Sequence, residues 1–170
     1  MNACLADLLH DQLRDLYDAQ VQYRRLLPGM IECATHIRLR DFLVSTEQDA
    51  GEALSSLEEA CTLLGVSPEG VECAAMEGLI REARRSSEAT IDSATRDAAL
   101  IANAQRVAHY EIAGFGTASA FARCLGAARA ASLLASLADA AGARDRELTA
   151  IAVGGWFEPG VNEEAAVTAA

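Results

Sequence analysis

The sequence predicts a single all-α domain, a four-helix bundle with a long crossover that carries a short fifth helix. Hydrophobic residues make up 51% of the 170 residues, enough for one sizeable core. Aromatic residues are only 5%, and β-branched runs bounded by turn residues are missing, so strands have little to be built from. Four long segments place apolar residues three and four positions apart, which is the spacing of one helix face.

The first helix is predicted from near Cys4 to beyond Leu27, where Pro28 and Gly29 would kink or break it before residues 30–34 continue. One face of this helix is apolar except for Gln20. The face consists of Leu5, Leu9, Leu13, Leu16, Gln20, Tyr23 and Leu27.

The second helix is predicted over about residues 37–64, with Gly65 as its C-terminal cap and turn residues at 67–70. Its apolar face is interrupted by Glu47. The face consists of Leu39, Leu43, Glu47, Ala50, Leu54, Leu57, Cys61 and Leu64.

A shorter amphipathic helix follows, from Cys73 to about Arg85. It lies within the connection between the second and third long helices, which is far longer than the other two connections. One long crossover of this kind is expected in ferritin-like topology.

The third long helix is predicted to be capped by Asp92 or Ser93 and to end near Leu125. Its apolar face places the carboxylate of Glu111 toward the core. The face consists of Ile101, Ala104, Ala108, Glu111, Phe115, Ala118, Ala122 and Leu125.

The fourth long helix is predicted over about residues 127–152, and Asp145 interrupts its apolar face. That face consists of Ala131, Leu134, Ala138, Ala141, Asp145, Leu148 and Ala152. Each long helix therefore offers one inward polar group. The bundle is expected to occupy residues 1–153, and residues 154–170 are expected to form a mobile acidic tail. Within this tail, we expect Trp156 to pack on the end of the bundle rather than to bind a partner.

The net charge of −11 and the pI near 4.6 argue against nucleic acid, whose binding depends on clustered lysine and arginine. Anionic membranes are disfavoured by the same sign, and no apolar run reaches the ~20 residues of a membrane-spanning helix. The first residues lack a basic stretch followed by an apolar one, so no signal peptide is predicted. We therefore expect a cytoplasmic protein.

Five cysteines are widely spaced and form no Cys-x-x-Cys pair, which argues against a zinc knuckle or a thioredoxin-like centre. They are Cys4, Cys33, Cys61, Cys73 and Cys124. Small buried thiols are the preferred interpretation, and thiol redox chemistry is the alternative.

Several motifs over about residues 5–152 resemble one known family. They are Asp15-Leu-Tyr-Asp-Ala19, Cys73-Ala-Ala-Met-Glu-Gly-Leu-Ile80, Arg96-Asp-Ala-Ala-Leu-Ile101 and Gln105-Arg-Val-Ala-His-Tyr-Glu-Ile112. Together they resemble the YciF-like family of bacterial stress-associated proteins, within the ferritin-like superfamily. The resemblance implies a bundle that is usually homodimeric, with a carboxylate-rich centre for a pair of metal ions, iron being the expected metal.

The sequence departs from that family at the positions of the expected metal ligands. Neutral or apolar residues replace the usual ligands at Gln20, Ala50, Ala108 and Ala141. The residual metal-ligand positions are Glu47, Glu111 and Asp145, with Gln20 as a weak fourth ligand. Three carboxylates cannot hold two metal ions in the usual way.

Arg144 lies three residues after Ala141, where a helical Glu-x-x-His pair would place its imidazole. A guanidinium can take the place of a metal cation because it forms two parallel hydrogen bonds to carboxylates. We therefore expect Arg144 to bridge Glu47 and Glu111. The alternative is that Arg144 points to solvent beside Arg146, while the acids bind water or titrate.

These observations favour a non-catalytic structural or interaction module, homodimeric and stress-related as the resemblance implies, with a degenerate dinuclear centre and no cofactor. No catalytic residue is predicted, and His109 is expected to be structural or interfacial. The alternative is an iron-binding protein in which the residual positions hold one metal ion or a weak pair, with oxidase or peroxide-related activity. No serine or cysteine triad, P-loop or dinucleotide fingerprint supports another class of enzyme.

Overall fold

The computed structural model describes residues 4–90 and 92–168, and within them the named elements are six helices. The helices are α1 (Leu5–Cys33), α2 (Ile37–Leu64), α3 (Ala74–Ala89), α4 (Ser93–Cys124), α5 (Ala128–Val153) and α6 (Val161–Thr168). The predicted boundaries at 1–153 and 154–170 also include residues 1–3, 91 and 169–170, which lie outside the described residues. The all-α prediction is confirmed.

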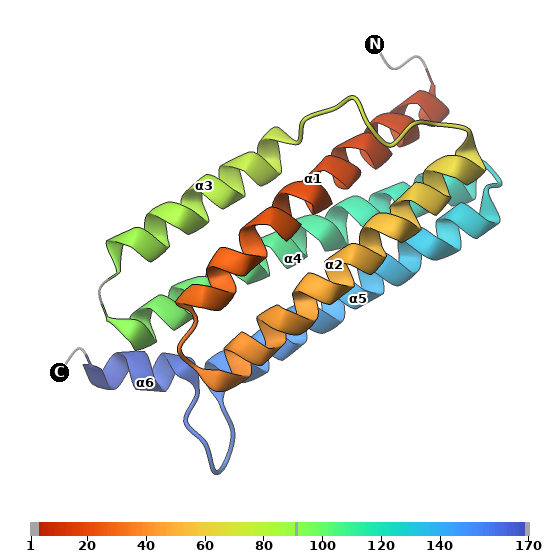
Figure 1. Ribbon diagram of the computed structural model, residues 1–170. Coiled ribbons are helices and arrows are strands. Elements are labelled where there is room, and N and C mark those ends of the chain that lie inside the picture. Colours follow the sequence, from red (N-terminus) through yellow and green to blue (C-terminus); the bar gives the residue numbers. More distant parts are fainter. Residues whose placement is uncertain (1–3, 91, 169–170) are drawn as a thin grey trace.

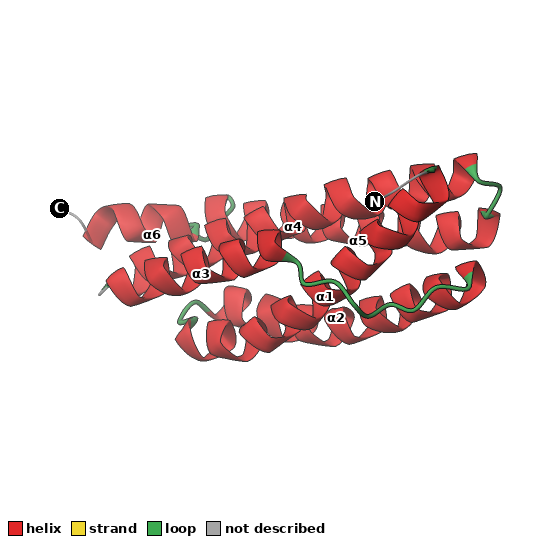
Figure 2. Cartoon of the chain, turned by 90° about the horizontal axis from the view of Figure 1, so that it is seen from above, coloured by secondary structure: helices red, strands yellow, loops and turns green. Residues whose placement is uncertain are grey.

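The four long helices α1, α2, α4 and α5 lie side by side, and short turns join α1 to α2 and α4 to α5 (Figures 1 and 2). The long connection from α2 to α4 crosses the bundle and carries α3, which packs against α1 and α4. This is the predicted crossover topology. None of the described helices combines the length and the hydropathy that crossing a membrane requires.

Pro28 and Gly29 were expected to kink or break the first helix, but α1 continues without a break through Pro28 to Cys33. Pro28 is only five residues from the last residue of the helix, so its missing N–H affects the final turns alone. Those turns are held by Met30, which is buried, and by the Ala34 N–H, which donates to the Met30 carbonyl at 3.0 Å.

The helix ends follow the predicted caps. Gly65 has a φ of 67°, a left-handed conformation that suits glycine, and its N–H donates to carbonyls of the last turn of α2. At the start of α4, the Asp92 carboxylate accepts from the Thr95 N–H at 2.7 Å. The Gly65 cap marks the start of the crossover and the Asp92 cap marks its end. Together they determine the residues at which α2 stops and α4 begins.

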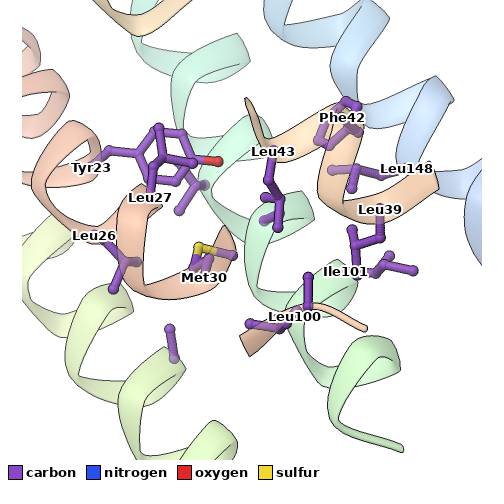
Figure 3. Close-up of a cluster of buried hydrophobic side chains, with 14 of the residues drawn as sticks. Tyr23, Leu26, Leu27, Met30, Leu39, Phe42, Leu43, Leu100, Ile101 and Leu148 are labelled. Carbon is purple, nitrogen blue, oxygen red and sulfur yellow. The ribbon is translucent and has the colours of Figure 1, made fainter. Parts of the chain in front are cut away.

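The core has two apolar clusters, one toward each end of the bundle. On α1, the residues up to Leu16 belong to one cluster, and those from Ala19 onward belong to the other. Figure 3 shows part of the second cluster, in which side chains from α1, α2, α4 and α5 converge. Two buried polar residues, Gln20 and Glu111, lie at the boundary between the clusters.

Gly114 is where α4 approaches α1 closely: a Cβ added there would lie 2.5 Å from Leu16 Cδ2. Leu16 is only 1% exposed, so its side chain has little room to move. We expect Gly114→Ala to destabilise the protein by about 1 kcal/mol, because overpacking costs about 1–3 kcal/mol and exceeds the gain in helix propensity. Urea denaturation measures this change.

Gly116→Ala is the control, since nothing lies within 4 Å of a Cβ there, and it should be neutral or stabilising. Equal stabilisation by both changes would contradict the close approach.

The prediction that residues 154–170 form a mobile tail is wrong for the described residues, because Val161–Thr168 form helix α6. Helix α6 packs on α4 and α5, and Val161 is fully buried at its start. Val161 is the one buried residue among the described side chains of this helix, too weak a pattern to predict it. Trp156 is 99% exposed, so the prediction that it packs on the bundle is also wrong.

The prediction of buried cysteines is correct for Cys61 and Cys73 and wrong for the other three, which are exposed. Cys33 and Cys124 are the last residues of α1 and α4, and Cys4 directly precedes α1. Helix ends lie outside the packed part of the bundle, which explains their exposure.

Candidate functional site

A buried polar layer lies at the boundary of the two apolar clusters. Gln20 of α1 and Glu111 of α4 are each only 1% exposed, and Arg144 of α5 has a side chain that is 14% exposed. The Gln20 Nε2 group donates to Glu111 Oε1 at 2.5 Å, and the Arg144 guanidinium donates to Glu111 Oε2 at 2.5 Å. Each oxygen of the Glu111 carboxylate therefore has its own donor.

Helical spacing places these three side chains together. Gln20 follows Leu16 by four residues, and Glu111 precedes Phe115 by four. Leu16 and Phe115 are both buried in one cluster. Arg144 lies between Ala141 and Leu148, which are both buried on α5. Steps of three and four therefore bring all three polar residues to the inward faces of their helices.

Charge in the polar layer is balanced locally. The Arg144 guanidinium neutralises the Glu111 carboxylate in a place where an unpaired charge would be strongly disfavoured. Burial raises the pKa of the neighbouring Tyr23 phenol well above its ordinary value of 10.0, and the Glu111 charge raises it further. Tyr23 therefore stays neutral, and the layer holds one negative and one positive charge.

The expected bridge from Arg144 is found to Glu111 but not to Glu47. Glu47 is half-buried and lines a surface pocket with Arg24 and Arg25, and among the described residues no ion pair joins it to Arg144. The inward polar residue of α2 is instead Thr46, which is 2% exposed. Thr46 donates its hydroxyl to the Phe42 carbonyl at 2.9 Å, so it is satisfied within its own helix.

Asp145 is not in the polar layer either. Its side chain is 21% exposed, with Gln105 Nε2 at 3.2 Å and His109 Nε2 at 3.4 Å from Oδ1. These residues lie along the seam of α4 and α5, where Asp145 also lines a surface pocket. His109 has a side chain that is 67% exposed, beside the inward face of α4 as its position indicates.

The residues of the layer do not fit a pair of metal ions. Of the residual positions, only Glu111 and Gln20 are in contact, and a guanidinium already donates to the single carboxylate. In the part of the chain that the structure describes, no three His, Cys, Asp or Glu side chains are grouped so that they could hold a metal ion. A dinuclear centre needs several anionic oxygens at one point, and this layer provides two, both hydrogen-bonded.

A second polar network, which was not predicted from the sequence, joins α1, α4 and the start of α3. The Tyr110 hydroxyl donates to Asp15 and lies 3.0 Å from the Cys73 sulfur. The Cys73 N–H donates to Asp18 at 2.7 Å. Asp15 and Asp18 are three residues apart on α1, a spacing that places both on one helix face and could have suggested the network.

This network predicts how stability depends on pH. Burial, followed by hydrogen bonds with Asp15 and Cys73, raises the pKa of Tyr110 above its ordinary value of 10.0. Above pH 10 the unfolded chain loses this proton while the folded chain keeps it, so the free energy of unfolding should fall as pH rises. We expect Tyr110→Phe to make this fall shallower, as measured by urea denaturation across the alkaline range. Tyr110→Phe should also lower stability at neutral pH by about 1–2 kcal/mol, through loss of the hydrogen bond to Asp15. An unchanged alkaline slope would contradict the assignment.

The turn between α1 and α2 is held by a buried carboxylate that was also not predicted. Asp97 of α4 is 2% exposed and accepts hydrogen bonds from the Thr35 N–H at 2.9 Å, the Thr35 hydroxyl at 2.6 Å and the His36 N–H at 2.7 Å. His36 is the N-cap of α2, so Asp97 fixes the point at which the chain turns from α1 into α2. The helical spacing could have indicated it, because Asp97 lies four residues before Ile101, the first residue of the apolar face of this helix.

The fold and this site define a class: crossover four-helix bundles whose central polar layer contains a buried carboxylate. Within this class, the chain belongs to the family described as a domain of unknown function, DUF892, which matches residues 4–166. It is 36% identical to Protein YciF of Escherichia coli K12 over 152 residues, which cover 88% of this chain and 90% of that protein. The resemblance to the YciF-like family is confirmed.

Two solved structures share the fold. The chain superposes on YcfI from Rhodopseudomonas palustris with a TM-score of 0.85 and 38% identity, covering 88% of this chain and 95% of that one. It superposes on the E. coli stress protein YciF with a TM-score of 0.84 and 32% identity, covering 87% of this chain and 94% of that one.

Proposed function

We propose that this protein is a non-catalytic, ferritin-like member of its family that acts as a structural or interaction module. Its central layer, in this proposal, is a degenerate dinuclear metal centre in which the Arg144 guanidinium takes the place of the cation. A stress-related setting is supported by the E. coli relative, which is described as a stress protein. A structural role is supported by the R. palustris relative, which is provisionally described as a structural protein.

The contact between Arg144 and Glu111 carries the proposal. Its 2.5 Å distance and the 1% exposure of Glu111 mean that the remaining inward carboxylate is already neutralised. A metal ion bound to Glu111 would have to displace the guanidinium and leave that positive charge buried beside it. The layer also lacks an anionic partner for Glu111, because its other hydrogen-bonded neighbour is the neutral amide of Gln20.

Elemental mass spectrometry of the freshly purified protein, before and after incubation with ferrous iron and air, tests this proposal. We expect no stoichiometric metal in either sample, together with an intact helical circular dichroism signal. Glu111→Gln is the matched variant, because it keeps the shape of the side chain and removes the only carboxylate in the layer.

One or two equivalents of iron per chain, lost in Glu111→Gln, would overturn the proposal. They would support the alternative function, an iron-binding protein with oxidase or peroxide-related activity. Iron retained by Glu111→Gln would instead place the metal outside the polar layer, and the guanidinium substitution would stand.

A further inference from the structure

Two aromatic side chains project from the loop between α5 and α6. Trp156 and Phe157 are each 99% exposed, although large aromatic residues are normally among the more buried ones. They lie at the tip of a narrow loop, because the Gly155 N–H donates to the Glu158 carbonyl at 3.0 Å and Gly154 pairs with Pro159. We call residues 155–158 the aromatic tip.

The base of this loop is closely packed. A Cβ at Gly154 would lie 2.2 Å from the Gly160 nitrogen, and a Cβ at Gly160 would lie 2.3 Å from the Val153 carbonyl carbon. Backbone contacts this close leave room only for glycine, so the loop is held at its neck. The buried Val161 then anchors the chain on the bundle at the start of α6. The aromatic tip is therefore presented in a defined position, which lowers the entropy lost on binding.

A cavity of about 240 Å³ lies between α1, α3 and α4. Most of its lining residues belong to the C-terminal parts of α1 and α3, which lie at the same end of the bundle as the loop between α5 and α6 (Figure 1). Its apolar residues include Leu26, Met30 and Leu100, which are buried in the core cluster. Arg25, Arg84 and Glu88 also line it, so its charged residues sum to one net positive charge. We call this cavity the α1/α3 pocket.

The arginines of the α1/α3 pocket are free to bind an incoming acid. Among the described residues, neither Arg25 nor Arg84 takes part in an ion pair. The chain carries 25 acidic and only 14 basic residues, so two arginines at one apolar cavity form a locally positive site on an acidic chain. Arginine also stacks favourably on aromatic faces.

We propose that the aromatic tip of one copy inserts into the α1/α3 pocket of a second copy. Trp156 and Phe157 fill the apolar part of the pocket, and Glu158 pairs with Arg84 at its edge. The match combines apolar surface with opposite charge, and both features come from this chain alone. It therefore gives the expected homodimer a specific surface, independently of whether the protein binds metal.

The area involved requires that the exchange be reciprocal. One buried Trp or Phe contributes about 150–250 Å², so one tip in one pocket falls short of the about 1,200–2,000 Å² of a stable interface. Two tips in two pockets bury four aromatic side chains, about 600–1,000 Å², and the facing pocket walls bring the total toward the lower end of that range. Because tip and pocket lie toward the same end of the bundle, a twofold axis can relate the two contacts and close the dimer.

Trp156 is the single tryptophan of the chain, so its fluorescence reports on the tip directly. We expect its emission to shift to shorter wavelength as protein concentration rises, in step with dimer formation seen by analytical ultracentrifugation. Phe157→Ala should raise the dimer dissociation constant about 30-fold or more, as expected for a buried aromatic anchor. Leu63→Ala is the control, since Leu63 is an exposed apolar residue at the far end of α2 and should leave dimerisation unchanged.

Charge reversal tests the pocket itself. Arg84→Glu and Glu158→Arg should each weaken the dimer at least about tenfold, and the two changes combined should restore it. Arg85→Glu introduces the same change at an exposed neighbour that does not line the pocket, and it should have no effect. A monomer at every concentration, a dimer insensitive to Phe157→Ala, or a failure of the combined variant to recover would each overturn the proposal.

Discussion

Arg144→Ala is expected to lower the free energy of unfolding by about 3–5 kcal/mol, the usual cost of removing one partner from a buried ion pair. The Glu111 carboxylate would keep only the Gln20 amide as a donor, in a position that is 1% exposed. Its negative charge would then be buried without compensation. Urea denaturation followed by circular dichroism measures the loss.

The neighbouring Arg146→Ala is the matched control for this change. Arg146 is exposed on the same helix, and among the described residues no ion pair involves it. We expect its removal to change stability by no more than about 0.5 kcal/mol. Equal effects of the two changes would show that Arg144 does not neutralise Glu111.

Replacing the whole polar layer by apolar residues separates two free energies. One is the loss of stability when the ion pair is broken, and the other is the net stabilisation that the intact pair provides. Replacing Gln20, Glu111 and Arg144 together with leucine or methionine should cost far less than Arg144→Ala alone, because such replacements are often neutral or stabilising. A triple variant less stable than Arg144→Ala would mean that the ion pair is itself strongly favourable.

Asp97→Ala is the second change with a large expected effect, about 3 kcal/mol or more. Asp97 accepts two backbone N–H groups and one hydroxyl at the turn between α1 and α2. Hydrogen bonds to charged groups contribute about 1.5–3 kcal/mol each, and their values are not additive. Removing the carboxylate also leaves the donors of Thr35 and His36 without their acceptor.

Denaturation gives the overall cost of Asp97→Ala, and amide hydrogen exchange locates it. The Thr35 and His36 amides should exchange faster, together with those of the first turn of α2. Asp41→Ala is the control, because Asp41 is an exposed acid near the start of α2, close in sequence to this turn. Unchanged exchange at Thr35 would contradict the role of Asp97 in holding the turn.

The helices could be predicted because their boundaries depend on local chemistry. The start and end of α2 match the prediction, and Gly65 and Asp92 cap helices through interactions within a few residues. The aromatic tip and α6 could not be predicted in the same way. Val161 anchors α6 through contacts with α4 and α5, which lie far away in the sequence.

The helical spacing correctly placed Gln20 and Glu111 on inward faces, and the expected contact of Arg144 with Glu111 is found. Glu47 and Asp145, which were also expected to point inward, each lie one position away from the inward residue of their helix. On α2 the steps through Leu43, Glu47 and Ala50 are as helical as those through Leu43, Thr46 and Ala50, and only the second set is inward. On α5 the same ambiguity separates Asp145 from Arg144. A one-residue choice rotates the side chain by about 100°, and packing against other helices decides it.

The polar layer also determines how the helices are aligned along the bundle axis. Leucine and alanine side chains on either side of it are similar enough that α4 could slide along α1 by one turn, about 5.4 Å, and still find apolar partners. Such a slip would carry Glu111 away from Gln20 and Arg144, opposite Leu16 or Tyr23. An unpaired charge inside the core would make every shifted arrangement costly, so the ion pair, together with the hydrogen bond from Tyr110 to Asp15, keeps an alanine-rich bundle in one register.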